Sequence, residues 1–136
     1  MPLLLLYDSI KLILNKHVGF QIAQVRAIFS FPRVARDELP PNVHAPKHLA
    51  YVELFTPFTQ QPHADHRLYT VSRRIADGGH RIAAILPATD ICRSVHLYPK
   101  FGPVAPREWT SSTVLDLASH FYANPWTDRH AYITIQ

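Results

Sequence analysis

The stretch GFQIAQVRAIFSF, residues 19–31, decides the fold class that we expect for this chain. It is rich in β-branched and aromatic residues, which favour a β-strand. Successive side chains of a strand point to opposite faces, so Val25, Ala27 and Phe29 would share one face. The apolar alternation changes phase near Ala23, which indicates a bulge or a bend. The stretch therefore predicts a long strand that is not straight.

Other segments carry strand and turn signals of the same kind. The tetrapeptide DGGH, residues 77–80, is typical of a tight turn, so we expect a hairpin between the strands on either side of it. Residues 3–14 are apolar and fit either a short helix or a strand. The tail, residues 129–136, fits a closing strand. The remaining expected strands are residues 49–58, 67–75, 81–86 and 90–98.

One segment near the C-terminus has a different period. From Val114 to Phe121, apolar residues recur at i, i+3, i+4 and i+7, which is the spacing of an amphipathic helix. Pro125 would close this helix, because the residue before a proline is disfavoured in helical conformation. The sequence thus predicts a mainly β protein of the α+β type, a small antiparallel β barrel or curled sheet with a C-terminal helix over residues 110–123.

Length and composition predict a single domain over residues 1–136 that buries a core of its own. Twelve prolines against four glycines indicate many stiff turns. Residues 32–48 hold four of these prolines and mixed charge, which favours a loop. The apolar N-terminus lacks a basic leader and is interrupted by Asp8, and no apolar run is long enough to span a membrane. The single cysteine, Cys92, fits a reducing compartment, so we expect an intracellular protein.

Positive charge is concentrated in one half of the chain. The net charge of the whole chain is +4, whereas the segment from residue 67 to residue 107 alone carries +5. Aromatic residues alternate with the basic ones there, and such a surface could hold phosphates and stack bases. The alternative is that the aromatic residues lie in the core and the basic residues are ordinary solvated positions. The candidate binding residues are Arg73, Arg74, Arg93, Lys100, Arg107, Tyr98 and Trp109.

The nine histidines raise the hypothesis of a metal site. His44 and His48 are four residues apart, and His63, Asp65 and His66 form an H-x-D-H run. Two histidines at that four-residue spacing share a face only on a helix, which the surrounding prolines disfavour, and zinc requires three or four converging ligands. We therefore interpret these residues as polar loop histidines, and the sequence predicts neither a metal nor a cofactor.

Other catalytic arrangements are poorly supported by the sequence. Cys92 and His96 would lie ~13 Å apart along one strand, too far for a dyad. Asp128 and His130 form half of a triad, but no serine occurs in a G-x-S-x-G context. No glycine-rich dinucleotide motif and no P-loop is present. The sequence favours a non-enzymatic role, with a small histidine-based metalloenzyme or hydrolase as the remaining catalytic alternative.

Most of the chain, from about residue 20 to residue 136, resembles the C-terminal region of a group of largely uncharacterised proteins of mushroom-forming (basidiomycete) fungi. Many of these proteins are associated with transposable elements. The resemblance is carried by LAYVELFTPF (49–58), HRLYTVSRR (66–74) and above all the run from Arg93 to His130. It implies a module of mobile-element origin and a nuclear location. The chain has no recognisable transposase core, so transposition chemistry is not implied.

A second analogy is to chromatin-associated β modules of the bromo-adjacent-homology type. The counterparts are YVELF (51–55), Pro57 and PATDI (87–91), with Leu54 where that module would have tryptophan. Together, charge and resemblance predict a non-enzymatic binding module that engages nucleic acid or a chromatin protein through a basic face. The alternative is a protein-interaction or oligomerisation domain that uses exposed aromatic residues. The sequence predicts no membrane partner and leaves the oligomeric state open.

Overall fold

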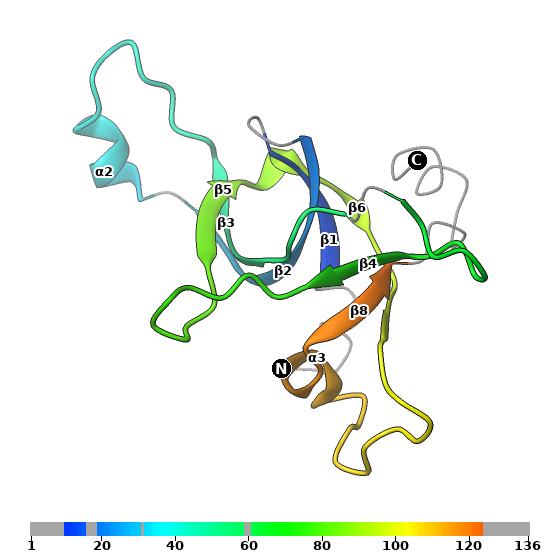
Figure 1. Ribbon diagram of the computed structural model, residues 1–136. Helices are drawn as coiled ribbons and strands as arrows, with labels where there is room; N and C mark the ends of the chain where they lie inside the picture. The colour runs from blue at the N-terminus through cyan, green and yellow to red at the C-terminus, as the bar shows by residue number, and fades with distance from the viewer. Residues whose placement is uncertain (1–9, 16–18, 31, 59–60, 124–136) are drawn as a thin grey trace.

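The computed structural model describes residues 10–15, 19–30, 32–58 and 61–123. In this part of the chain, eight strands form two antiparallel sheets (Figure 1). The larger sheet has the order β5-β3-β2-β1-β6, and the smaller sheet has the order β4-β8-β7. The strands of the larger sheet are β1 (Ile10–Asn15), β2 (Gly19–Ser30), β3 (His48–Leu54), β5 (Ala83–Pro87) and β6 (Ile91–Ser94). Those of the smaller sheet are β4 (Tyr69–Ser72), β7 (Leu97–Pro99) and β8 (His120–Ala123).

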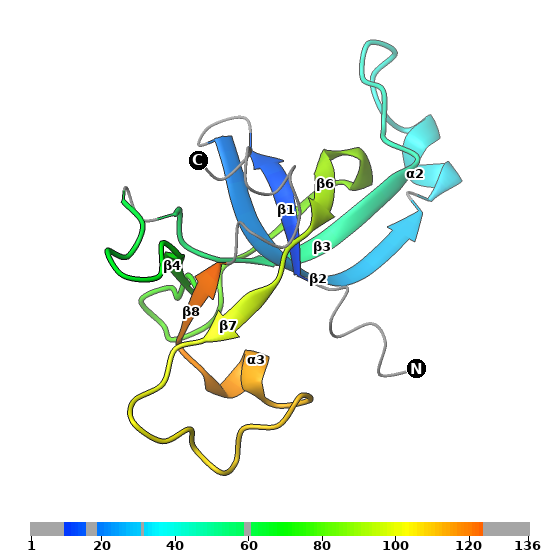
Figure 2. The same ribbon diagram turned by 90° about the vertical axis from the view of Figure 1, so that its right-hand side faces the viewer.

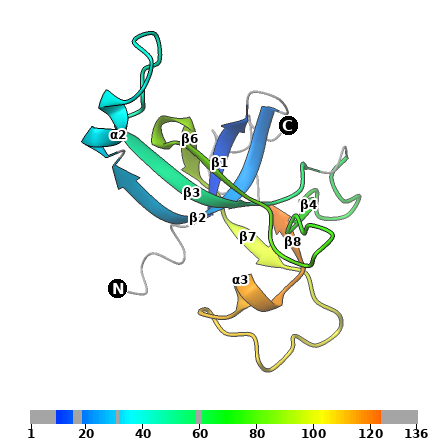
Figure 3. The ribbon, with the colours of Figure 1, turned by 90° about the vertical axis from the view of Figure 1, so that its left-hand side faces the viewer.

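Strand β2 organises the larger sheet. Its first half pairs with β1 and its second half with β3. The register with β3 shifts between Val25 and Ala27, which leaves Arg26 as an extra residue and bends the strand. The expected bend is therefore present, a few residues beyond Ala23. The described strands curl without closing into a barrel, as the turned views show (Figures 2 and 3). This confirms the mainly β fold and, of the two expected shapes, the curled sheet.

The main core lies where the two sheets meet. Leu12 and Ile22 of the larger sheet contact Val71 and Phe121 of the smaller sheet, and Phe55 lies between them with no exposed surface. A second apolar cluster covers the opposite face of β2 and β3. Residues 21–24 are consecutive and all buried, because both faces of β2 are covered at that point. Because β2 lies between two apolar clusters, this strand lacks a simple alternating burial pattern.

The hairpin expected around residues 77–80 is only partly correct. The turn is present, with the Ala76 amide donating to the His80 carbonyl at 2.9 Å and a bridge between Ile75 and Arg81. Beyond that bridge the two strands separate, because β4 pairs with β8 and β5 pairs with β3. The turn therefore passes the chain from the smaller sheet to the larger one.

The helix expected over residues 110–123 is wrong in most of its length. Only α3 (Val114–Leu117) is helical, and β8 begins at His120 as the central strand of the smaller sheet. A short helical turn followed by a strand directs Val114, Ala118 and Phe121 into the same core. The apolar spacing of a longer helix is thus satisfied by two different elements.

Four further expectations from the sequence have different outcomes. The segment 90–98 is two strands in different sheets, β6 and β7, with buried Val95 between them. The apolar segment 3–14 contains a strand, β1, and its residues before Ile10 lie outside the described part. The loop 32–48 contains a short exposed helix, α2 (Arg33–Asp37), and projects from the sheets (Figure 1). A 3-10 turn, η1 (Ala88–Asp90), joins β5 to β6. The tail 129–136 lies outside the described residues.

Candidate functional site

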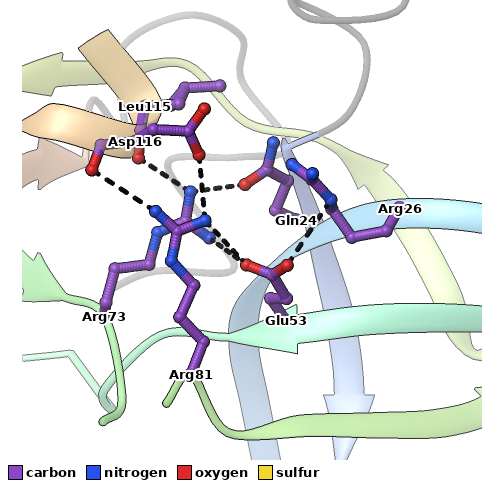
Figure 4. A network of polar contacts seen from close by, with 7 residues as sticks. All are labelled: Gln24, Arg26, Glu53, Arg73, Arg81, Leu115 and Asp116. Atoms are coloured by element: carbon purple, nitrogen blue, oxygen red, sulfur yellow. Dashed lines mark hydrogen bonds and ion pairs between the residues drawn. The ribbon is translucent and has the colours of Figure 1, made fainter. Parts of the chain in front are cut away.

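Arg73, one of the expected binding residues, lies in the interior. Its side chain is 5% exposed and its guanidinium stands 4.5 Å from the centre of the Phe55 ring. It donates hydrogen bonds to Gln24 Oε1 and to the Leu115 carbonyl, the latter at 2.8 Å (Figure 4). Burial lowers the pKa of Arg73 to about 10, so the side chain still carries its charge at neutral pH. Arg73 therefore joins the two sheets and is not part of an accessible basic surface.

Glu53 is the centre of the ionic network around Arg73. Its carboxylate lies 3.4 Å from Arg26, 3.4 Å from Arg73 and 2.9 Å from Arg81. Arg81 also binds Asp116 at 2.9 Å, which attaches α3 to the larger sheet (Figure 4). Burial acts to lower the pKa of Arg81, but its hydrogen bonds to Asp116 and Glu53 outweigh that effect and leave its pKa raised. Two basic residues of the +5 segment, Arg73 and Arg81, are therefore paired with carboxylates of the same chain.

The remaining candidates do not share one face. Arg74 is half-buried, and its backbone bonds to Leu54 and Ile82. Arg93 is half-buried on the edge strand β6, and Arg107 is exposed in the loop that precedes α3. Trp109 is half-buried against the main core, with its ring 6.2 Å from that of Phe101. Only Tyr98 and Lys100 are brought together on an exposed face, that of the smaller sheet.

The outward side of the smaller sheet is built by strand register. Tyr98 on β7 is paired with Tyr122 on β8, and Tyr122 is in turn paired with Thr70 on β4. Their neighbours along the strands, such as Phe121 and Val71, point inward and are buried. Because side chains alternate, the outward side collects a single set of residues. We call this set the tyrosine face: Thr70, Ser72, Tyr98, Lys100, His120 and Tyr122.

Lys100 and two histidines surround the ring of Tyr122. Lys100 lies just past β7, where its amide donates to the His120 carbonyl at 2.9 Å and its Nζ stands 5.7 Å from the centre of the Tyr122 ring. The His66 ring meets Tyr122 edge-on at 4.6 Å. The rings of His63 and His66 are stacked 3.9 Å apart. Cationic and aromatic groups therefore adjoin one another on an exposed surface.

Sequence reasoning missed Tyr122, and it interpreted His63 and His66 as polar loop residues after weighing them as metal ligands. The alternation of HFYA in β8, with its second and fourth residues buried, is the signal that was available. This alternation was overlooked because the apolar residues from Val114 onward have the spacing of a helix. The backbone amides of Asp65 and Leu68 each donate to a histidine Nδ1, at 3.2 Å, and this holds the loop that carries His63 and His66. Among the residues that the structure describes, no group of three or more His, Cys, Asp or Glu is arranged to hold a metal ion.

Comparisons with protein-family models, with curated proteins and with solved structures found no match for this chain. Within the described ranges, no helix has both the length and the hydropathy needed to cross a membrane.

Proposed function

We propose that this chain is a non-enzymatic binding module that engages single-stranded nucleic acid through the tyrosine face. The observation that carries the proposal is the cross-strand pair of Tyr98 and Tyr122 beside Lys100. Directly opposed residues of antiparallel strands have Cβ atoms ~5 Å apart, so the side chains of Tyr98 and Tyr122 start from neighbouring positions on the same face. Every base has a π-face, and stacking on such rings is worth about 1–3 kcal/mol per base.

The charges at the tyrosine face support the same ligand. Tyr98 is 42% exposed, and Lys100, His66 and His120 are also exposed, so phosphates have access to the Lys100 ammonium group and to two imidazole rings beside the stacking ring. A duplex hides its base faces, and this favours a single strand over a double helix. The proposal retains the mobile-element origin and nuclear location that the sequence resemblance implies. Of the expected basic residues, the proposal keeps only Lys100 as a phosphate-binding group on this face.

The test is fluorescence anisotropy with labelled single-stranded DNA and RNA of about ten nucleotides, a length within the range of small stacking domains. We expect Tyr98→Ala to weaken binding about 5- to 100-fold, which corresponds to the loss of one stacked base. Lys100→Ala should weaken binding and reduce the salt slope by about 0.7, the value for one phosphate of a single strand. Arg36→Ala, on the exposed helix α2, is the matched control and should leave both unchanged. The absence of binding at low salt, or binding insensitive to salt, would refute the proposal.

A second candidate function, self-association, is favoured by an apolar patch on the larger sheet. Phe29, Tyr51 and Ile85 lie on one outward face with 38%, 41% and 61% exposure, and Tyr51 is paired directly with Ile85. Ile85 belongs to β5, which is an edge strand of this sheet. Exposed apolar patches and open strand edges are sites of association. If this function holds, sedimentation velocity will show a dimer that Ile85→Lys converts to a monomer, whereas a wild-type monomer at every concentration speaks against it.

A further inference from the structure

A small cavity adjoins the tyrosine face where β7 meets α3. Its volume is about 190 Å³. Ile10, Val95 and Leu115 are among its apolar lining residues, whereas His96, Tyr98 and Ser111 are its lining residues with polar side chains. Val95 and Ile10 belong to the main core, so the cavity walls are fixed by packing from both sheets. The cavity is therefore part of the fold and is not formed by one loop alone.

The size and chemistry of this cavity fit one flat ring. An apolar protein cavity of about 150 Å³ holds a benzene-sized molecule, so 190 Å³ accommodates a single aromatic ring with substituents. The apolar walls favour a neutral, planar body, and the lining also includes residues with polar side chains, His96 and Ser111, which can bond with polar atoms at the edge of such a body. Nucleobases combine a planar ring with a polar edge in this way.

The position of Tyr98 connects the cavity with the tyrosine face. Tyr98 is one of the residues of that face, and it also lines the cavity. The ring of His96, another lining residue, lies 4.7 Å from the Tyr98 ring at 52°. Leu97 and Pro99, which flank Tyr98 in β7, also line the cavity and lie on the inward side of the smaller sheet. Because β7 is an edge strand, a nucleotide strand stacked on Tyr98 would pass around this edge to place its next base at the cavity. This continuity distinguishes a base from an unrelated small molecule as the occupant.

A larger hollow, of about 370 Å³, lies beside Arg73 and Arg81 and is a weaker candidate. Both guanidinium groups are already paired with Glu53, and Arg81 is also paired with Asp116. A phosphate there would compete with two carboxylates. The cavity beside Tyr98 has no such internal competitor among its lining residues, which include neither an acid nor an arginine.

We infer that this cavity receives one unstacked base of the bound strand and gives the module a preference for base identity. The inference rests on the proposed function, since it needs a strand already held on the tyrosine face. Stacking alone tolerates every base. A cavity with hydrogen-bonding groups at its edge discriminates against bases that leave those groups unpaired.

The test compares the affinities of labelled homo-oligomers of dT, dA, dC and dG, and of their RNA counterparts, each about ten nucleotides long. For the wild-type chain we expect a spread of at least about tenfold in Kd among the bases, which equals ~1.4 kcal/mol. Ser111→Trp places a large ring at the cavity and should reduce the spread in Kd to below about threefold. The base that binds most tightly to the wild type should then bind about as weakly as the others. Ser112→Trp is the matched control, because Ser112 is exposed and does not line the cavity, and it should retain the wild-type spread.

Methyl spectra of the wild type and of Ser111→Trp give an independent reading. Ring currents of an inserted base should shift the methyl signals of Val114 and Leu115 in the wild type and not in the variant, since both residues line the cavity. If oligomers bind tightly but Ser111→Trp leaves both the spread and the shifts intact, the cavity inference is wrong while the proposed function stands. If no oligomer binds at all, the proposed function fails and the inference fails with it.

Discussion

At the scale of single residues, Arg73 shows how far a charge can lie from the surface that its residue type suggests. Its neighbours Glu53, Gln24 and Leu115 come from distant parts of the chain, and together they solvate the guanidinium inside the protein. A buried charge is tolerated only when it is paired and hydrogen-bonded. The basic count of the sequence therefore overstated the charge that is available for binding.

The network predicts unequal costs for its members. Replacing Glu53 by Gln should lower the free energy of unfolding by about 3 kcal/mol, because it leaves the buried guanidinium of Arg73 without its counter-charge. Arg26→Ala should cost less than about 1 kcal/mol, since the Arg26 side chain is 41% exposed and its ion pair is partly solvated. Urea denaturation measures both. Equal losses of stability in the two variants would contradict the explanation that the buried Arg73–Glu53 ion pair stabilises the fold more than the exposed Arg26–Glu53 pair.

At the scale of secondary-structure elements, the turn at residues 76–80 connects one sheet to the other. Gly79 has a φ of +84°, a conformation that residues with a Cβ rarely adopt, and its amide donates to the Ala76 carbonyl at 2.8 Å. The DGGH signal was therefore correct about the turn. It carried no information about which strands the turn connects, because pairing with β3 and β8 depends on segments far along the chain.

The two adjacent glycines of this turn make a matched pair. Gly79→Ala should destabilise the protein by about 1–2 kcal/mol, because a Cβ there meets no atom within 4 Å and the cost comes from the backbone alone. Gly78→Ala should stay within about 0.5 kcal/mol of the wild type, since its Cβ would contact only the ring of His80, at 3.3 Å, and His80 is an exposed side chain with room to shift. Thermal or urea unfolding distinguishes them, and a larger loss from Gly78→Ala would overturn this explanation.

At the scale of the whole molecule, Phe55 joins the two sheets. Its amide donates to the Ile22 carbonyl at 3.0 Å, and its carbonyl accepts from the Gln21 side chain at 2.6 Å. Its ring contacts Phe121 edge-on at 5.8 Å, and its backbone forms a bridge with Arg73. Phe55 has no exposed surface. Phe55 therefore helps to hold the smaller sheet, and the tyrosine face with it, in place beside the ionic network of Arg73.

Removing the Phe55 ring should weaken both sheets together. We expect Phe55→Ala to cost about 3–5 kcal/mol, the range for deleting a buried phenyl ring. Amide exchange should then accelerate by at least about 100-fold in both β2 and β8, because a loss of 3 kcal/mol corresponds to more than two powers of ten. Phe101→Ala, at an exposed ring, is the control and should change neither strand. Faster exchange in β8 with β2 unchanged would show that the sheets are stable independently.

Particular elements show why the sequence predicted some features and not others. Strands β2 and β3 were found because β-branched and aromatic residues and an alternating pattern mark them locally. Strand β8 was missed because the apolar residues from Val114 to Phe121 fit a helix equally well, and only pairing with β4 and β7 resolves that ambiguity. Of the candidate site, Tyr98 and Lys100 were predicted. Tyr122 was not predicted, because its place beside Tyr98 depends on the register between β7 and β8, which the local sequence does not reveal.

The sequence by itself determined that the chain is mainly β, where its central strand and its tight turn lie, and that positive charge gathers in one half. Local residue types carry this information, because propensity and alternation act between near neighbours. Only the tertiary structure decided that Arg73 is internal, that β4 and β5 belong to different sheets, and that Tyr98 lies beside Tyr122. Each of these depends on contacts between residues far apart in sequence, whose pairing is settled by the packing of the whole core around Phe55.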